Sequence, residues 1–304
     1  MADRLDRPHF VIIGAMKCAT TTLHDQLAAQ PGVFMSDPKE PNFFSDEDQW
    51  ARGLGWYRGL FEGAPPSALC GESSTHYTKL PTHPHAAERL QRHLPDARLV
   101  YVMRDPIGRL VSQYIHEWSV RAVSEPIDQA VRSFPPLIDY SKYATQLRPW
   151  MDRFGPARVL PVFFERLTRD PQAELERVWR FVWAGRDDAP GEPVWRQEAA
   201  ARNVSAQRMR RGPVLDRLLR VRVLQQARRT LLPESVRDRI KRRWRMEHRP
   251  ELGEAARAWC VERIDPDMAE LGRMLGMSLS CDTFRASVLE APAPPEWAAT
   301  EATT

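Results

Sequence analysis

Short apolar runs alternate along this chain with longer segments whose apolar residues recur at helical spacing. Apolar runs of strand length occupy residues 10–13, 33–35, 68–71, 98–103 and 158–164. Helical spacing is found at residues 20–30, 84–93, 106–118, 140–154 and 171–182. Short continuous apolar runs are typical of strands buried on both faces. This alternation predicts an α/β fold in which a parallel sheet has helices on both faces and binds ligands beyond the carboxyl ends of its strands.

The last third of the chain departs from this pattern. About residues 200–279 read as mostly helical and basic, and residues 202–249 hold far more arginine and lysine than acidic residues. The net charge of the whole chain is only +4, so the basic charge is concentrated there. Either this region faces an anion or it is a solvated arginine-rich surface. Beyond residue 287, alanine, proline, threonine and glutamate dominate. We therefore expect one domain over residues 1–285, with a basic helical region near 200–250, and a disordered tail over 286–304.

Composition narrows the class of protein. The four cysteines are scattered without metal-binding spacing, which predicts reduced, mostly buried thiols and no metal site. The N-terminus lacks the apolar core of a signal peptide, and no run approaches the ~20 apolar residues that span a bilayer. These features predict a cytoplasmic protein without a membrane span, and they leave its oligomeric state open.

Residues 9–23 form the most informative segment. An apolar run ends at Gly14 and passes through Lys17 and three consecutive hydroxyl residues into a helical pattern. The start of a helix presents unpaired N–H groups and the positive end of its dipole. Lys17 adds a full charge there, and Thr20, Thr21 and Thr22 add hydroxyl donors. The segment therefore predicts a phosphate-binding loop.

The spacing of this loop differs from that of a Walker A motif, which reads G-x-x-x-x-G-K-[ST]. Here Lys17 comes three residues before Thr20, the second glycine is missing, and no strand clearly ends in a magnesium-binding acid. A metal-dependent nucleotide hydrolase is disfavoured, although a P-loop-type kinase or ATPase remains an alternative.

A second motif, R-D-P-x-x-R-x-x-S-x-Y, begins at Arg104 and ends at residue 114. Arg104 follows a predicted strand, while Ser112 lies two turns into the next helix. Both side chains can therefore donate to one anion in the crevice beyond the strand ends.

Together the two segments resemble sulfotransferases that use 3′-phosphoadenosine 5′-phosphosulfate (PAPS). The likeness is greatest to the bacterial and heparan-sulfate-type branch, whose loop reads approximately G-x-x-K-[AGC]-G-T-[TS]-x-L. The resemblance implies a P-loop-like three-layer sandwich in which Arg104 and Ser112 hold the 3′-phosphate. It assigns the 5′-phosphosulfate to the loop residues Lys17, Cys18, Ala19, Thr20, Thr21 and Thr22.

Two further features accompany this resemblance. Ala19 replaces the usual glycine, and a positive φ there would be strained by about 1 kcal/mol. Residues 203–208 resemble the N-x-S-x-x-R stretch that leads to a lid over the donor, which makes Arg208 a candidate donor contact. Arg210, Arg211 and Arg249 are weaker candidates.

Sulfuryl transfer needs an in-line acceptor and charge compensation on the departing phosphate. Lys17 would supply that charge, and the sulfuryl group carries less charge than a phosphoryl group, so no metal is needed. A general base must also take the acceptor proton. Glu40 matches a catalytic glutamate of the heparan-type branch in an E-x-x-F-F context, and its apolar neighbours are expected to raise its pKa.

His76 is the second candidate base, because it follows the third predicted strand, broadly where cytosolic-type sulfotransferases place a catalytic histidine. Its imidazole would titrate near neutrality. We expect Glu72 and Ser73 to shape the same pocket, and Trp50, Trp56 and Trp118 to pack rather than to stack on the adenine.

The sequence thus favours a bacterial or cytosolic sulfotransferase that moves a sulfuryl group from PAPS to a hydroxyl of a carbohydrate, lipid or secondary metabolite. The product would be 3′-phosphoadenosine 5′-phosphate (PAP), and the expected partners are a small molecule or a glycan rather than a nucleic acid. A polyanion-binding protein that uses the basic region is the other alternative.

Overall fold

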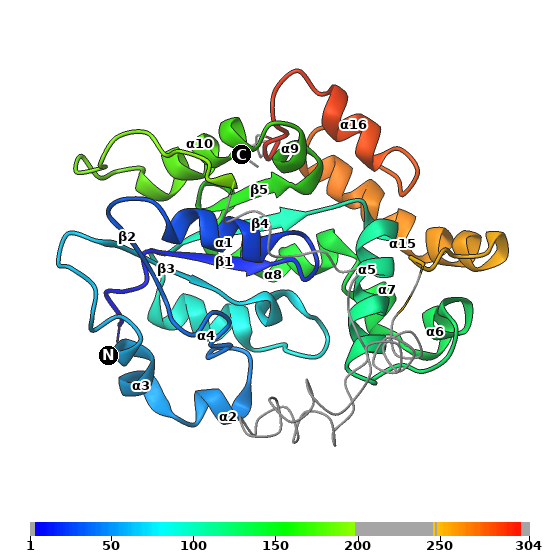
Figure 1. The fold of residues 1–304 in the computed structure, drawn as a ribbon, viewed down its shortest axis with the longest axis horizontal. Coiled ribbons are helices and arrows are strands. Elements are labelled where there is room, and N and C mark those ends of the chain that lie inside the picture. The colour runs from blue at the N-terminus through cyan, green and yellow to red at the C-terminus, as the bar shows by residue number, and fades with distance from the viewer. Residues whose placement is uncertain (1–3, 198–245, 247, 299–304) are drawn as a thin grey trace, which may run out of the picture.

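The computed structural model describes residues 4–197, 246 and 248–298. Five strands form one parallel sheet in the order β2-β3-β1-β4-β5 (Figure 1). They are β1 (Phe10–Gly14), β2 (Val33–Met35), β3 (Leu69–Ser73), β4 (Arg98–Met103) and β5 (Val159–Phe163). Strands β1, β3 and β5 are buried along their whole length, as continuous apolar runs require. The predicted α/β fold with a parallel sheet is confirmed.

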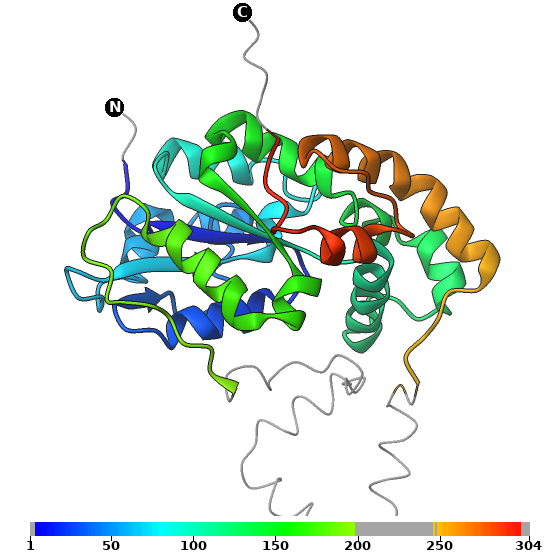
Figure 2. The ribbon, with the colours of Figure 1, turned by 90° about the horizontal axis from the view of Figure 1, so that it is seen from above.

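Helices cover both faces of this sheet (Figure 2). On one face lie α1 (Thr20–Ala28) and α10 (Pro171–Trp183), and on the other lie α4 (Ala86–His93) and α8 (Tyr143–Phe154). Helix α5 (Pro106–Ser119) begins directly beyond the carboxyl end of β4. Right-handed crossovers between parallel strands produce this three-layer arrangement.

Shorter helices complete the fold. They are α2 (Glu47–Trp50), α3 (Gly53–Gly59), α6 (Ile127–Ser133), α7 (Pro136–Asp139), α9 (Phe164–Arg169) and the 3₁₀ turns Thr75–Thr78 and Pro156–Arg158. Near the C-terminus, α15 (Glu254–Met274) packs against α8 and precedes α16 (Phe284–Glu290). Within the described ranges, no helix is both long and apolar enough to cross a membrane.

The C-terminal segment differs from the expected disordered tail. Helix α16 spans the predicted boundary at residue 286, and Phe284 and Val288 are fully buried. The Trp297 indole N–H donates to the Val159 carbonyl oxygen, and Arg166 donates to the Val288 carbonyl oxygen at 3.0 Å. A few apolar anchors at helical spacing are enough to dock a segment whose average composition is that of a disordered chain. Residues 299–304 lie outside the described part.

Candidate active site

One cavity of about 650 Å³ opens beyond the carboxyl ends of β1, β3, β4 and β5. It joins the loop after β1 to the start of α5, so the two motifs that are predicted to bind phosphate face the same space. Most of the predicted site residues line it, namely Lys17, Ala19, Thr20, Thr21, Thr22, Glu40, His76, Arg104 and Ser112. Arg208 and residues 202–245 of the basic region lie outside the described residues.

The loop after β1 has a backbone that few sequences tolerate. Gly14 has φ +154°, and a Cβ there would lie 2.0 Å from Oγ1 of Thr78, whose hydroxyl donates to the Ile13 carbonyl oxygen at 2.8 Å. Lys17 and Ala19 both have positive φ, at 71° and 67°. The strain expected at Ala19 is therefore present, on the order of 1 kcal/mol. The loop holds this strained shape at the mouth of the cavity.

Helix α1 starts at this loop without a side-chain cap. Ala19 is its N-cap residue, and a methyl group cannot accept a hydrogen bond. Serine, threonine, aspartate or asparagine usually fills this position and satisfies the first N–H groups. Because Thr20, Thr21 and Thr22 line the cavity, the uncapped turn faces it. An anion in the cavity would supply the missing acceptor.

Cys18 is the member of the predicted set that the cavity leaves out. Its side chain is fully buried, and its N–H donates to the Ala15 carbonyl oxygen at 3.3 Å. Burial raises the pKa of its thiol to about 11, so the thiol stays protonated at neutral pH. Its side chain is therefore turned away from the cavity, and a contact of Cys18 with the donor stays a prediction.

The Cys18 sulfur instead lies 3.8 Å from the hydroxyl oxygen of Tyr143, at the start of α8. That hydroxyl donates to the Arg104 carbonyl oxygen at 2.7 Å and accepts from the Arg104 N–H at 3.3 Å. Tyr143 therefore connects the two motifs directly. No local pattern in the sequence marks it, because its importance arises only from tertiary contacts.

The second motif is held so that Arg104 faces the cavity. Asp105 accepts from the Gly108 N–H and caps α5, while its own N–H donates to the Glu165 carboxylate at 2.8 Å. The Arg104 guanidinium lies 4.4 Å from the centre of the Phe164 ring. Among the described residues, the Arg104 guanidinium makes no ion pair with Asp105. Its charge therefore faces the cavity, which Ser112 also lines.

Glu40 stands on a loop that is fixed to the end of β3. Its N–H donates to the Ser73 carbonyl oxygen at 3.0 Å, and its carboxylate pairs with Lys39 at 2.6 Å. Burial acts to raise the pKa of Glu40, but the charge and the hydrogen bond of Lys39, together with the charge of Lys79, outweigh it and lower the pKa. The expected rise is therefore wrong, and Glu40 is ionised at neutral pH.

His76 lies in the 3₁₀ turn after β3 and stacks on His83, with ring centroids 4.9 Å apart. Burial, with help from the Lys79 and His83 charges, lowers the pKa of His76 to about 4. His76 is therefore neutral at pH 7 rather than titrating near neutrality. At neutral pH both candidate bases are therefore in the form that can accept a proton.

Glu72 and Ser73 do not line the cavity, contrary to expectation. Both are fully buried, and the Glu72 carboxylate accepts from the hydroxyls of Tyr57 and Ser74. Burial raises the pKa of Glu72. Glu72 supports the wall behind the site and does not face a ligand.

Several cavity residues were not predicted from the sequence, namely Lys79, His116, Phe164, Leu167, Trp195 and Gln197. Of the arginines given as weaker candidates, Arg249 does line the cavity, and it donates to the Gly108 carbonyl oxygen at 3.2 Å. The tryptophan among the described residues that line this cavity is Trp195, whereas Trp50 and Trp56 pack against Phe43.

Glutamine side chains hold Trp195 in place. Gln172 on α10 accepts from the Trp195 N–H and donates to the Pro193 carbonyl oxygen, both at 2.8 Å. Gln26 on α1 and Gln30, just beyond its end, each make two such hydrogen bonds, to the backbone of Arg196 and of Val194 respectively. A primary amide can bond a peptide group through both its oxygen and its nitrogen. Residues 193–196 are thus clamped between α1 and α10.

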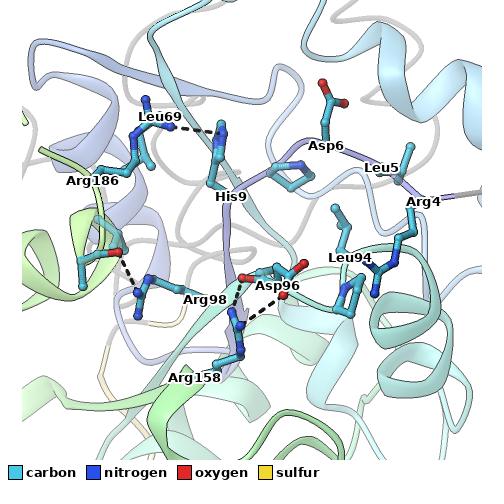
Figure 3. Close-up of a pocket in the computed structure, with 15 residues that line it drawn as sticks. Arg4, Leu5, Asp6, His9, Leu69, Leu94, Asp96, Arg98, Arg158 and Arg186 are labelled. Atoms are coloured by element: carbon cyan, nitrogen blue, oxygen red, sulfur yellow. Dashed lines mark hydrogen bonds and ion pairs between the residues drawn. The ribbon is translucent and has the colours of Figure 1, made fainter. Parts of the chain in front are cut away.

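A second, smaller pocket of about 230 Å³ lies at the opposite ends of the strands (Figure 3). Arg158 pairs there with Asp96 at 3.1 Å, and Arg98 donates to the Ala184 carbonyl oxygen at 2.7 Å. Arg186 lies beside His9. None of the predicted site residues lines this pocket.

Comparisons with known proteins agree with this geometry. Residues 60–185, which include the second motif, match the profile of the sulfotransferase family. The chain is 32% identical over 187 residues to heparan sulfate glucosamine 3-O-sulfotransferase 3B1 of Mus musculus, covering 58% of this chain and 46% of that protein. It is 33% identical over 126 residues to the membrane-associated sulfotransferase kil1 of Dictyostelium discoideum, covering 40% and 26%.

The fold also has a counterpart of known structure. A sulfotransferase from Alicyclobacillus acidocaldarius superposes with a TM-score of 0.63 at 21% identity, covering 90% of this chain and 98% of that one. The chain spans about half the length of the heparan sulfate 3-O-sulfotransferases that it matches. The chain is therefore similar to sulfotransferases over residues 60–185 by the matched profile and over more than half its length by these relatives, and it shares the fold of a bacterial sulfotransferase.

Proposed function

We propose that this chain transfers the sulfuryl group of PAPS to a hydroxyl group and releases PAP. The observation that carries the proposal is the single cavity shared by the uncapped start of α1, with Lys17, and by Arg104 with Ser112. PAPS carries an anionic group at each end of its ribose. A cavity with cationic or N–H donor groups at two places suits such a ligand.

In this proposal Lys17 and the first turn of α1 hold the 5′-phosphosulfate. Arg104 and Ser112 hold the 3′-phosphate, and the Phe164 ring beneath Arg104 keeps its guanidinium in place. Lys17 then stabilises the charge that develops on the 5′-phosphate as the sulfur–oxygen bond to it breaks.

Glu40 is the proposed general base. The acceptor hydroxyl loses its proton to the Glu40 carboxylate, its oxygen forms the new bond to sulfur, and the bonding pair of the broken bond leaves with PAP. Because Lys39 and Lys79 keep the pKa of Glu40 low against the effect of burial, the carboxylate is ready before the acceptor arrives. His76 is the alternative base, since it is neutral at pH 7.

The acceptor supplies the hydroxyl oxygen that attacks the sulfur. Relatives that match the chain are named for the glucosamine of heparan sulfate, so a glycan hydroxyl is the first class to test. Hydroxyls of lipids and secondary metabolites follow. A panel of these acceptors with a radiolabelled sulfate donor identifies the class.

Donor binding is tested by calorimetry with PAP on the wild type and on two matched arginine variants. Arg104 follows β4 at its carboxyl end, whereas Arg98 begins the same strand at the other end. We expect Arg104→Ala to weaken PAP binding by at least about tenfold, the effect of one charge-assisted contact. Arg98→Ala should leave PAP binding unchanged. Equal effects of both variants would contradict the assigned site.

Catalysis is tested separately from binding. Lys17→Ala should abolish transfer, and Glu40→Gln should keep PAP affinity while transfer falls by about 10²-fold or more. If Glu40→Gln stays fully active and His76→Ala does not, His76 is the base. Thermal stabilisation by ATP with magnesium but not by PAP would favour the kinase alternative, and salt-sensitive heparin binding without a PAP effect would favour the polyanion-binding one.

A further inference from the structure

Arg109 is the second arginine of the motif that begins at Arg104, and the proposed donor site does not use it. It lies at the end of the first turn of α5, its side chain is fully buried, and it does not line the cavity. A guanidinium is charged at every pH at which proteins fold. The fold therefore keeps a complete positive charge in its interior.

The hydrogen-bond partners of this charge are all neutral. Its Nε and Nη2 donate to the Ser141 hydroxyl oxygen at 3.0 and 2.7 Å, and Nη2 also donates to the Leu137 carbonyl oxygen at 2.9 Å. Its Nη1 is buried and makes no hydrogen bond in the described part of the chain. Nor does any described carboxylate lie within ion-pair distance of Arg109. A buried charge with no counterion destabilises a fold unless something else compensates it.

The surroundings of Arg109 show where compensation can come from. Ser112, one helical turn further along α5, lines the donor cavity. Arg109 also acts on Cys18, which lies in the loop after β1. Burial raises the pKa of the Cys18 thiol, and the positive charge of Arg109 opposes this rise. The electrostatic field of Arg109 therefore reaches the buried side of that loop. Interactions across a protein interior are screened far less than those across water. An anion in the cavity therefore feels this charge without touching it.

We propose that Arg109 is an internal counter-charge for the bound donor: the phosphate groups of PAPS compensate it from the far side of the loop and of α5. The inference rests on the proposed function. Without ligand, the uncompensated charge destabilises the fold. With the donor bound, the same charge raises its affinity, so Arg109 positions the anion through the interior.

The test compares three variants by calorimetry with PAP and by thermal unfolding without ligand. Arg109→Met removes the charge, Arg109→Lys keeps it but loses the fork of hydrogen bonds, and Ser141→Ala keeps the guanidinium but loses its main acceptor. We expect Arg109→Met to weaken PAP binding about tenfold, as one charge interaction across a partly buried site does. Arg109→Lys and Ser141→Ala should stay within about threefold of the wild type. The ligand-free Met variant should unfold at the wild-type temperature or above.

A purely structural role predicts a different pattern, in which loss of hydrogen bonds weakens all three variants together. PAP affinity that is unchanged in Arg109→Met, or equally reduced in Arg109→Lys and Arg109→Met, would overturn the inference. Should Arg109→Met fail to fold, the other two decide, because a tenfold loss in Ser141→Ala also overturns it. Added potassium chloride should leave the ratio of Met-variant to wild-type affinity unchanged, since a buried charge is poorly screened. Failure of the proposed function is separate, because wild-type protein would then not bind PAP.

Discussion

Lys79 lines the cavity, and its ammonium group is largely removed from water there. It is only 9% exposed, and burial lowers its pKa from 10.5 to about 8 although Glu40 and Glu117 act to raise it. A difference of about 2.5 pKa units corresponds to about 3 kcal/mol. Because the pKa in the fold lies below that in the unfolded chain, this destabilisation is complete below about pH 8 and disappears as the pH rises toward 10.5.

We therefore expect Lys79→Met, which keeps the aliphatic stem, to raise the free energy of unfolding at pH 7 by about 3 kcal/mol. At pH 10 the gain should shrink to about 1 kcal/mol, because the wild-type lysine is then neutral in the fold and only partly charged in the unfolded chain. Urea unfolding of the wild type and of the variant at the two pH values measures both gains in the free energy of unfolding.

The control is Lys142→Met. The Nζ of Lys142 lies 3.6 Å from Oδ1 of Asp139, and its side chain is 31% exposed. It should change stability by less than about 1 kcal/mol at either pH. A gain for Lys79→Met that is equal at pH 7 and pH 10 would show that packing, not charge, is responsible. A loss at pH 7 would refute the reasoning outright, since the contacts of the ammonium would then outweigh its burial.

Three further predictions concern the supports of the site. Gly14→Ala places a methyl group 2.0 Å from Oγ1 of Thr78 and should lower the free energy of unfolding by more than about 2 kcal/mol. Adding Thr78→Ala should recover part of this loss. No recovery would show that the clash is not its cause. Asp267→Asn weakens a cap in which the carboxylate accepts from the N–H groups of Ala144 and Thr145, both at 2.8 Å, and should cost about 1–2 kcal/mol in urea unfolding; an unchanged midpoint would contradict this. Gln26→Leu removes both hydrogen bonds to the Arg196 backbone. Tryptic cleavage after Arg196, followed by mass spectrometry, should then become about tenfold faster. Cleavage at the wild-type rate would show that these hydrogen bonds are not needed to hold the segment.

The strands and the two motifs could be predicted because their signals are local. Each apolar run of strand length became a strand, and parallel strands bring their carboxyl ends to one edge. Lys17, His76 and Arg104 therefore had to meet once the sheet was known to be parallel. Helix starts were equally clear where proline or a capping aspartate marked them, as at residues 105–106 and 170–171.

What escaped prediction depends on neighbours in space. The residues beside Glu40 in sequence are largely apolar and suggest a raised pKa, whereas in the fold the charges of Lys39 and Lys79 lower it. Tyr143 carries no local signal, and it matters only because β4 and the loop after β1 both reach it. Trp195 likewise carries no local signal, and its place depends on Gln172 of α10, which holds its N–H, and on Gln26 of α1, which holds the N–H of the next residue.

The two bonds of Tyr143 to the Arg104 backbone, and its contact with Cys18, have a consequence for which nucleotides fit. A single phenol joins the loop after β1 to the backbone of Arg104, so the separation of these two segments is set before any ligand enters. Under the proposed function, these two segments are the anchors for the two phosphate groups. The pocket then selects nucleotides by the distance between their phosphate groups. A nucleotide that extends its charge along one triphosphate chain would engage one anchor and leave the other empty, whereas a nucleotide phosphorylated at both the 3′ and 5′ positions would engage both.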